Sequence, residues 1–90
     1  MSCLISPERR ARCIQLAYTA ELPATMETTA WAARRADVTA PALFAAHDRG
    51  ELMPVYWRGA LWWDAALTDA WASPAAKLER RQRASRAVKR

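Results

Sequence analysis

Two short runs of mainly aromatic and β-branched residues on either side of a glycine restrict the fold of this chain most strongly. The runs are Val55-Tyr56-Trp57 and Leu61-Trp62-Trp63, and Arg58-Gly59-Ala60 joins them. Such side chains favour strands, and a short connection that contains glycine is typical of a β-hairpin. Because a lone two-stranded hairpin is only marginally stable in water, this one must pack against helices. We expect most of that contact to come from three tryptophans, Trp57, Trp62 and Trp71.

Start and stop signals before the hairpin predict three helices. Ser6, Thr28 and Thr39 are residue types that cap helix N-termini, and two of them precede a proline in the first turn. Gly50 suits the left-handed position that follows many helices. The predicted helices cover residues 7–20, 29–36 and 40–49. The second and third, joined by a short turn, form a candidate helix-turn-helix.

Two more helices are predicted after the hairpin. Asp64 caps a helix over residues 65–72, and Ser73-Pro74 ends it and begins a last helix from Ala75 onward. The expected fold is therefore mainly α with one β-hairpin, in the order of a winged helix-turn-helix. We divide the chain into an N-terminal helical extension (1–27), the winged helix-turn-helix (28–73) and a basic C-terminal helix (74–90).

The basic residues are concentrated at the C-terminal end. Residues 77–90 contain seven Lys and Arg and one Glu, whereas residues 1–76 contain seven Arg and eight acidic residues. The whole net charge of +5 therefore comes from the last segment. A block of this kind binds a polyanion such as nucleic acid, or else remains a solvated tail without a partner. The candidate phosphate contacts are Lys77, Arg80, Arg81, Arg83 and Arg86.

Several function classes are disfavoured by what the sequence lacks. We find no paired carboxylates, no nucleophile with a base, no phosphate-binding glycine loop and no metal-ligand spacing, so we expect neither an enzyme nor a cofactor. No apolar run approaches the roughly 18–20 residues that span a bilayer, so we expect no membrane helix. Because the N-terminus has no apolar signal segment, Cys3 and Cys13 are expected to be reduced thiols of a cytoplasmic protein.

Residues 28–71 carry a family resemblance. Its most specific parts are Gly50-Glu51-Leu52-x-Pro54 and the later Leu67-x-x-x-Trp71. They are accompanied by Ala33, Val38-Thr39, Leu43, Arg49, Gly59, Trp62 and Asp64. With these residues the chain resembles the excisionase family, which has a MerR-like winged-helix fold and comprises the recombination directionality factors of temperate phages and of integrative and conjugative elements.

The resemblance implies a protein that binds DNA and performs no chemistry itself. In the family, the second helix of the motif enters the major groove and the hairpin, or wing, reaches an adjacent minor groove. Members bind several direct repeats cooperatively, bend the DNA and direct a partner integrase toward excision. The expected partners are therefore double-stranded DNA, an integrase of the tyrosine recombinase class, and further copies of the chain in a head-to-tail array.

The helix that would enter the groove offers little base-reading chemistry. Where the family often has arginines after the helix cap, this chain has Ala40 and Pro41, so no bidentate contact to guanine is available there. Thr39 offers a hydroxyl to a phosphate or a base, and Ala40 and Pro41 offer apolar contacts to thymine methyls. Phe44 lies against the DNA backbone or packs in the core. We therefore expect weak direct readout and more dependence on DNA shape.

Three more arginines are candidate DNA contacts. Arg58 at the hairpin tip either inserts into the minor groove or remains an exposed turn residue. Arg34 or Arg35 either faces a phosphate or lies on an ordinary exposed helix face near Asp37. In the same region, we expect Leu43 and Ala46 to face the core and the single histidine, His47, to be partly buried with a structural role.

Two other functions remain open. One is a small MerR-like transcriptional regulator that uses the same fold, although 90 residues leave little room for an effector or long dimerisation helix. The other is a protein-interaction module whose partner surface combines the N-terminal helix with two tryptophans expected to be exposed, Trp31 and Trp63.

Overall fold

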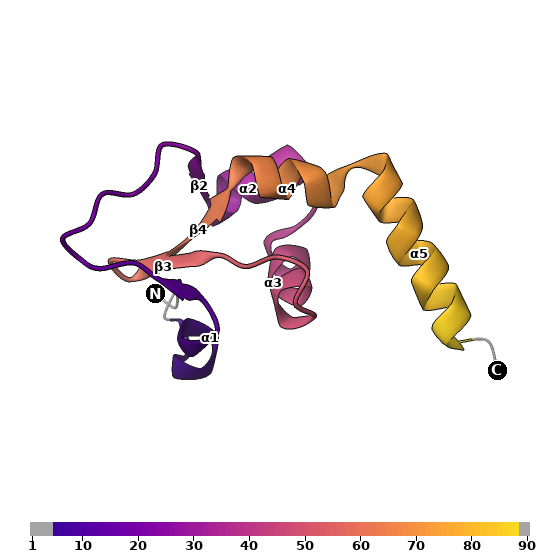
Figure 1. The fold of residues 1–90 in the computed structure, drawn as a ribbon, viewed down its shortest axis with the longest axis horizontal. Coiled ribbons are helices and arrows are strands. Elements are labelled where there is room, and N and C mark those ends of the chain that lie inside the picture. The colour runs from indigo at the N-terminus through magenta and orange to yellow at the C-terminus, as the bar shows by residue number, and fades with distance from the viewer. Residues whose placement is uncertain (1–4, 89–90) are drawn as a thin grey trace.

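The computed structural model describes residues 5–88, which form five helices and a four-stranded sheet (Figure 1). The elements in chain order are α1 (Pro7–Ala11), β1 (Ile14–Gln15), β2 (Met26–Thr28), α2 (Thr29–Ala36), α3 (Ala40–Asp48), β3 (Val55–Trp57), β4 (Ala60–Asp64), α4 (Ala65–Ala72) and α5 (Pro74–Val88). The predicted helices over 29–36, 40–49 and 65–72 are therefore confirmed to within one residue.

Side-chain caps set the starts of these three helices. The hydroxyls of Thr28 and Thr39 and the carboxylate of Asp64 each accept a hydrogen bond from the backbone N–H three residues later. These bonds satisfy donors that have no partner inside the helix. At the other end of α3, Gly50 adopts φ +80°, the left-handed conformation predicted for it.

The predicted helix over residues 7–20 is wrong beyond Ala11. The next residues turn, and residues 14–15 form β1, which pairs parallel to β3. The backbone N–H of Ile14 donates to the carbonyl of Pro54 at 3.0 Å. The open edge of β3 thus offers backbone hydrogen-bond partners to residues 14–15. This pairing overrides the local sequence pattern that predicts a helix there.

The sheet has the strand order β1-β3-β4-β2. Its centre is the predicted antiparallel hairpin of β3 and β4, which is confirmed, and β2 pairs antiparallel to β4. The two outer strands were not predicted. The expectation of a mainly α chain with one hairpin is therefore only roughly met, since the described residues form a small α/β protein.

Trp63, predicted to be exposed, is the largest fully buried side chain, with 1% of its surface accessible. Side chains alternate between the two faces of β4, so Leu61 and Trp63 both enter the core between the sheet and the helices. Trp62 points to the other face, where it packs edge-on against Trp57. The three tryptophans predicted to form the core are only partly buried, namely Trp57, Trp62 and Trp71.

The expectation that Leu43 and Ala46 face the core is confirmed, because both have no accessible surface. His47 is buried as well, at 3%. Its Nδ1 lies 2.8 Å from Nη1 of Arg9 and its Nε2 lies 3.2 Å from the carbonyl of Arg12. Because a guanidinium can only donate, Nδ1 accepts and Nε2 carries the proton. His47 therefore fixes α1 onto α3.

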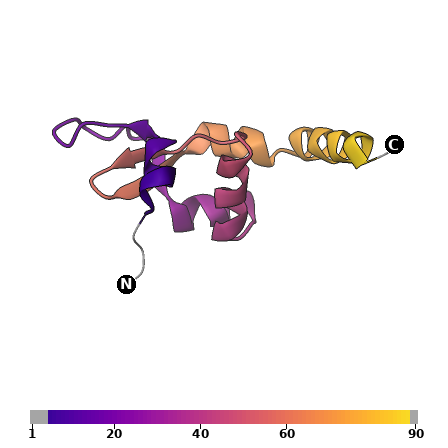
Figure 2. The ribbon, with the colours of Figure 1, turned by 90° about the horizontal axis from the view of Figure 1, so that it is seen from below.

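The last helix, α5, leads away from the rest of the molecule (Figures 1 and 2). The described part of the chain is accordingly elongated, with principal extents of 49 × 25 × 22 Å. α5 follows α4 directly, with Ser73 between them in extended conformation. Among the described residues, no helix combines the length and the apolar character needed to cross a membrane.

Candidate nucleic-acid interface

The helices α2 and α3 are joined by three residues, 37–39. Asp37 takes the left-handed conformation with φ +59°, and the N–H of Val38 donates to the carbonyl of Ala33 at 2.9 Å. This tight turn orients the two helices, which also pack against each other. The antiparallel hairpin follows α3 after a short loop, and its second strand, β4, contacts α2.

The outer face of α3 carries no basic side chain. Pro41 and Asp48 are exposed there, while Ala40 and Ala45 are half-buried. Thr39 uses its hydroxyl oxygen to accept from the N–H of Ala42 at 3.3 Å, and its O–H proton remains free to donate. A groove-facing α3 would therefore contribute one hydroxyl, several apolar surfaces and the carboxylate of Asp48, which Arg9 and Arg12 neutralise.

Phe44 packs inside the molecule. Its ring is half-buried, with its centroid 6.0 Å from that of Trp63, and the guanidinium of Arg9 covers it at 4.9 Å. Of the two interpretations of this aromatic, the contacts favour core packing under α1. Phe44 accordingly positions α1 beside α3.

The predicted contacts on α2 differ in availability. Arg35 donates two hydrogen bonds to the carboxylate of Asp69 on α4, at 2.7 and 2.9 Å. These bonds raise the pKa of Arg35 and lower that of Asp69. Arg34 lies instead over the ring of Trp31 at 5.4 Å and is exposed. The charge of Arg35 is thus balanced by a neighbouring helix, and that of Arg34 is not.

The hairpin tip is tied to the loop of residues 16–25, which lies beside it in both ribbon views (Figures 1 and 2). The guanidinium of Arg58 lies between two rings, 4.5 Å from the centroid of Tyr18 and 4.3 Å from that of Trp57. Its Nε also donates to the carbonyl of Tyr18 at 2.9 Å. Arg58 is exposed, but these contacts hold its guanidinium in place.

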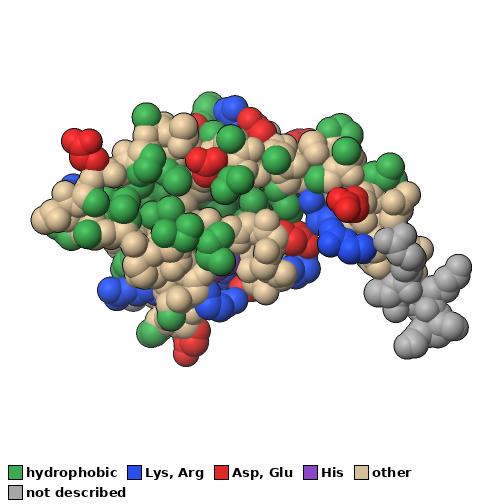
Figure 3. Space-filling model, in the orientation of Figure 1, with side chains coloured by type: hydrophobic (Ala, Val, Ile, Leu, Met, Phe, Trp, Pro, Cys, Tyr) green, Lys and Arg blue, Asp and Glu red, His purple; other side chains and the backbone are tan. Residues whose placement is uncertain are grey.

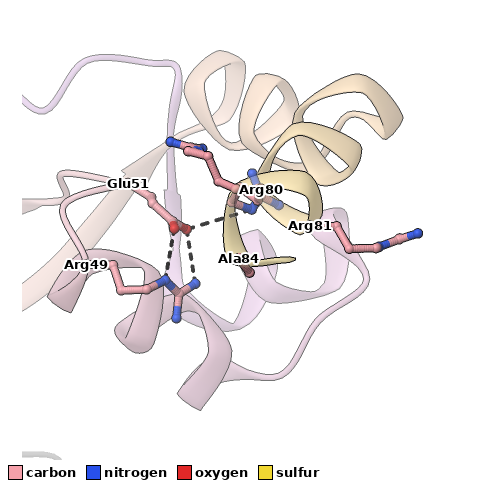
Figure 4. A pocket seen from close by; sticks show the side chains of 6 residues that line it. Arg49, Glu51, Arg80, Arg81 and Ala84 are labelled. Carbon is pink, nitrogen blue, oxygen red and sulfur yellow. Dashed lines mark hydrogen bonds and ion pairs between the residues drawn. The ribbon is translucent and has the colours of Figure 1, made fainter. Parts of the chain in front are cut away.

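The C-terminal helix is attached to the body through Glu51. The carboxylate of Glu51 accepts two hydrogen bonds from Arg49 and lies 3.8 Å from Nε of Arg80 (Figure 4). It also accepts one hydrogen bond from the indole of Trp71. The hydrogen bonds from Arg49 are the main reason that the pKa of Glu51 is lowered to about 2. Arg80 further donates to the carbonyl of Trp71 at 2.8 Å.

The predicted cations of α5 therefore fall into two groups. Arg80 is partly buried and holds the helix, whereas Lys77, Arg81 and Arg83 are exposed. In Figure 4 the side chain of Arg81 points away from Glu51. Arg81 and Arg83 line an open recess of about 740 Å³ with Arg49 and Glu51. The side chain of Arg86 lies outside the described residues.

Three arginines to which the sequence assigns no role lie on or next to α1. Arg9 and Arg12 bind the carboxylate of Asp48 at the end of α3, at 3.0 and 3.2 Å. Desolvation alone would raise the pKa of Asp48, but these two guanidinium groups lower it. Arg10 lies over the ring of Tyr56 at 4.7 Å. The three arginines between residues 9 and 12 are the feature of the sequence that could have identified this basic segment.

Seen from one face, many of the basic side chains lie along the lower edge, from below β3 to the space between α3 and α5, with some acidic side chains among them (Figure 3). We call this the basic edge. The helices α1 and α3 both lie on this side of β3 (Figure 1). Among residues 5–88, no group of three or more His, Cys, Asp or Glu side chains is placed to hold a metal ion.

Comparison with known proteins identifies no relative of this chain. No family model matches the chain, and no curated protein or solved structure matches it either. The function of the basic edge therefore has to be inferred from its own charges and shape. The features that matter are the helix pair α2–α3, the hairpin β3–β4 and the exposed cations of α5.

Proposed function

We propose that this protein binds duplex DNA as a winged helix-turn-helix, and that it acts as an excisionase, a recombination directionality factor that directs an integrase toward excision. The observation that carries the proposal is the order of the elements: α2, a three-residue turn, α3, the hairpin β3–β4, α4 and then the projecting basic helix α5. α3 is the helix that would enter the major groove, and the hairpin would serve as the wing.

The distribution of charge supports binding through the DNA backbone. The exposed groups Lys77, Arg81 and Arg83 on α5 have only Glu79 as an acidic neighbour on their own helix. Neutralised phosphates release counterions, so such a contact makes affinity fall steeply with salt. α3 itself carries no side chain for bidentate base contacts, which favours recognition of DNA shape over direct base readout.

An accessory role in recombination follows from the weak base contacts expected of one copy. Several copies on phased direct repeats raise the effective concentration of each, and contacts between them would be head-to-tail. The elongated shape, with α5 projecting from one end, suits an open array of this kind. Bending of the bound DNA would then bring integrase sites together.

The first test is a fluorescence anisotropy titration of the intact chain on a generic 30-bp duplex at several salt concentrations. We expect binding that weakens by about a hundredfold or more between 50 and 200 mM salt, as about four or more phosphate contacts require. Absence of binding at low salt would reject the DNA proposal and favour the protein-interaction module. The partner surface expected for such a module is smaller, however, because of its two tryptophans Trp63 is buried and only Trp31 is exposed.

The second test separates an excisionase from a transcriptional regulator. An integrase encoded beside this protein is incubated with attachment-site DNA, with and without the protein, and the excision product is quantified. Excision that depends on the protein supports the proposal. Binding without any effect on excision, together with repression or activation of a neighbouring promoter, would assign it to the MerR-like regulators instead.

A further inference from the structure

We propose that the N-terminal segment and the hairpin tip together form a phosphate-binding site, in which Arg10 and Arg58 grip one phosphate of the DNA backbone. The site is the recess between α1, β1 and the hairpin turn, and we call it the hairpin-tip recess. It has a volume of about 320 Å³, and its lining includes Arg10, Gln15, Tyr18, Tyr56 and Arg58. This inference rests on the proposed binding of duplex DNA.

The lining of the recess is chemically suited to an oxyanion. Two arginines, Arg10 and Arg58, are among its lining residues, and no acidic residue is. Guanidinium groups bind phosphate oxygens through paired, charge-assisted hydrogen bonds, which are stronger than those to a neutral acceptor and which a cationic ligand could not form. The remaining polar groups are two tyrosines and the amide of Gln15. An anion is therefore the ligand that this set of side chains selects.

Both arginines belong to the half of the arginines with described side chains that form no ion pair, together with Arg34, Arg81 and Arg83. Within residues 5–85, ion pairs engage Arg9, Arg12, Arg35, Arg49 and Arg80 with Asp48, Asp69 or Glu51. In the same part of the chain, Arg10 and Arg58 contact aromatic rings instead. Their positive charges are thus left unbalanced, and both are placed at one recess.

Aromatic stacking holds both groups in position before a ligand arrives. Arg10 lies 4.7 Å from the centroid of Tyr56, and Arg58 lies between Tyr18 and Trp57. Stacking uses the faces of the guanidinium plane and leaves N–H donors along its edge, except for the Nε of Arg58, which donates to Tyr18. Donors that are already fixed lose less conformational entropy on binding.

The N-terminal segment is also fixed relative to α3. Gln15 donates its amide to the carbonyls of Arg10 and Cys13, which closes the turn that carries Arg10. Arg9 and Arg12 bind Asp48 at the end of α3. A duplex that received α3 in its major groove would therefore meet Arg10 on the same rigid body. The segment outside the resemblance to excisionases thus gains a role in binding.

The test compares Arg10→Gln with Arg12→Gln in the full chain, by anisotropy on the same 30-bp duplex from 50 to 200 mM salt. Both variants remove one positive charge from the same short segment, but Arg12 is already paired with Asp48. We expect Arg10→Gln to weaken binding about fivefold and to reduce the salt slope by about one, as loss of one phosphate contact does. We expect Arg12→Gln to change affinity less than twofold.

A double variant tests whether the two arginines share one phosphate. If they do, Arg58→Gln alone reduces the salt slope by about one, and Arg10→Gln with Arg58→Gln reduces it by about one in total rather than two. Arg10→Lys keeps the charge but lacks the fork, so it should bind better than Arg10→Gln and worse than the unchanged chain. Circular dichroism melting confirms that each variant is folded.

Two outcomes would overturn this inference, and they are distinguishable. If Arg10→Gln and Arg12→Gln weaken binding equally while the unchanged chain binds DNA, the recess is not a phosphate site but the proposed function stands. Independent, additive losses of slope from the two arginines would likewise show two separate contacts. If the unchanged chain does not bind duplex DNA at all, the proposed function and this inference fail together.

Discussion

Arg49 and Glu51 face each other just beyond α3, and the guanidinium of Arg49 donates two hydrogen bonds to the carboxylate of Glu51, at 2.9 and 3.0 Å. The same carboxylate accepts from the indole of Trp71 and approaches Arg80. One acidic group therefore connects the end of α3, the end of α4 and the first turns of α5. The orientation of the basic helix depends on it.

This relationship predicts how stability changes with pH. The pKa of Glu51 in the folded chain is about 2, against an ordinary value of 4.5, so folding favours the charged carboxylate. Its contribution to stability is complete above about pH 4.5 and is lost as the pH falls toward 2. Urea unfolding at pH 6, 4 and 3 should show this loss.

Glu51→Gln provides the comparison for that measurement. We expect it to lower the free energy of unfolding at pH 6 by about 1 kcal/mol, the size of a partly exposed ion pair with hydrogen bonds. Between pH 4.5 and 3 the variant should lose less stability than the unchanged chain. Parallel curves for the two proteins would show that other carboxylates account for the pH dependence.

The second prediction concerns Trp63, which is fully buried and donates its indole N–H to the hydroxyl of Thr29 at 2.9 Å. Trp63→Phe removes that hydrogen bond and part of the core volume, so we expect a loss of about 1–2 kcal/mol in the free energy of unfolding. Trp31→Phe, at a side chain that is 43% exposed, should cost less than about 0.5 kcal/mol. Equal costs in urea unfolding would contradict the assignment of the core.

The tryptophans also show what the sequence could and could not specify. Caps at Thr28, Thr39 and Asp64 are local signals, so the helices that they begin are predicted correctly. Which face of a strand is buried depends on the side from which helices cover the sheet, and no local signal contains that information. The prediction therefore buries the wrong face of β4, with Trp62 in the core where the structure has Trp63.

The N-terminal segment illustrates the same limit for the candidate site. β1 exists because the edge of β3 offers hydrogen-bond partners, which a helix prediction over residues 7–20 cannot include. Without that strand, nothing in the sequence places Arg10 close to the hairpin tip. The basic character of α5 is visible in the sequence, but the division between the anchoring Arg80 and the exposed arginines requires the position of Glu51.

The third prediction tests the backbone of the hairpin turn. Arg58 and Gly59 both have left-handed φ values, +50° and +81°, as the favoured two-residue hairpin turn requires. A Cβ at Gly59 would meet no atom within 4 Å, so Gly59→Ala costs only backbone strain, about 1 kcal/mol in the free energy of unfolding. Gly59→Asn should cost less, because Asn tolerates this conformation. Thermal melting that ranks Ala below Asn would confirm the turn type.

The fourth prediction separates the grip of α5 on DNA from its attachment to the body. In a triple variant, Lys77, Arg81 and Arg83 are replaced by Gln while Arg80 is kept, so the contacts to Glu51 and Trp71 remain. If these exposed cations neutralise phosphates, the salt slope should fall by about two to three.

The loss of affinity in this triple variant should exceed the loss caused by Thr39→Ala or Pro41→Ala on α3. Anisotropy at 50, 100 and 200 mM salt gives both quantities. A larger loss from the α3 substitutions would instead place the binding energy in the major groove and leave α5 as a solvated helix.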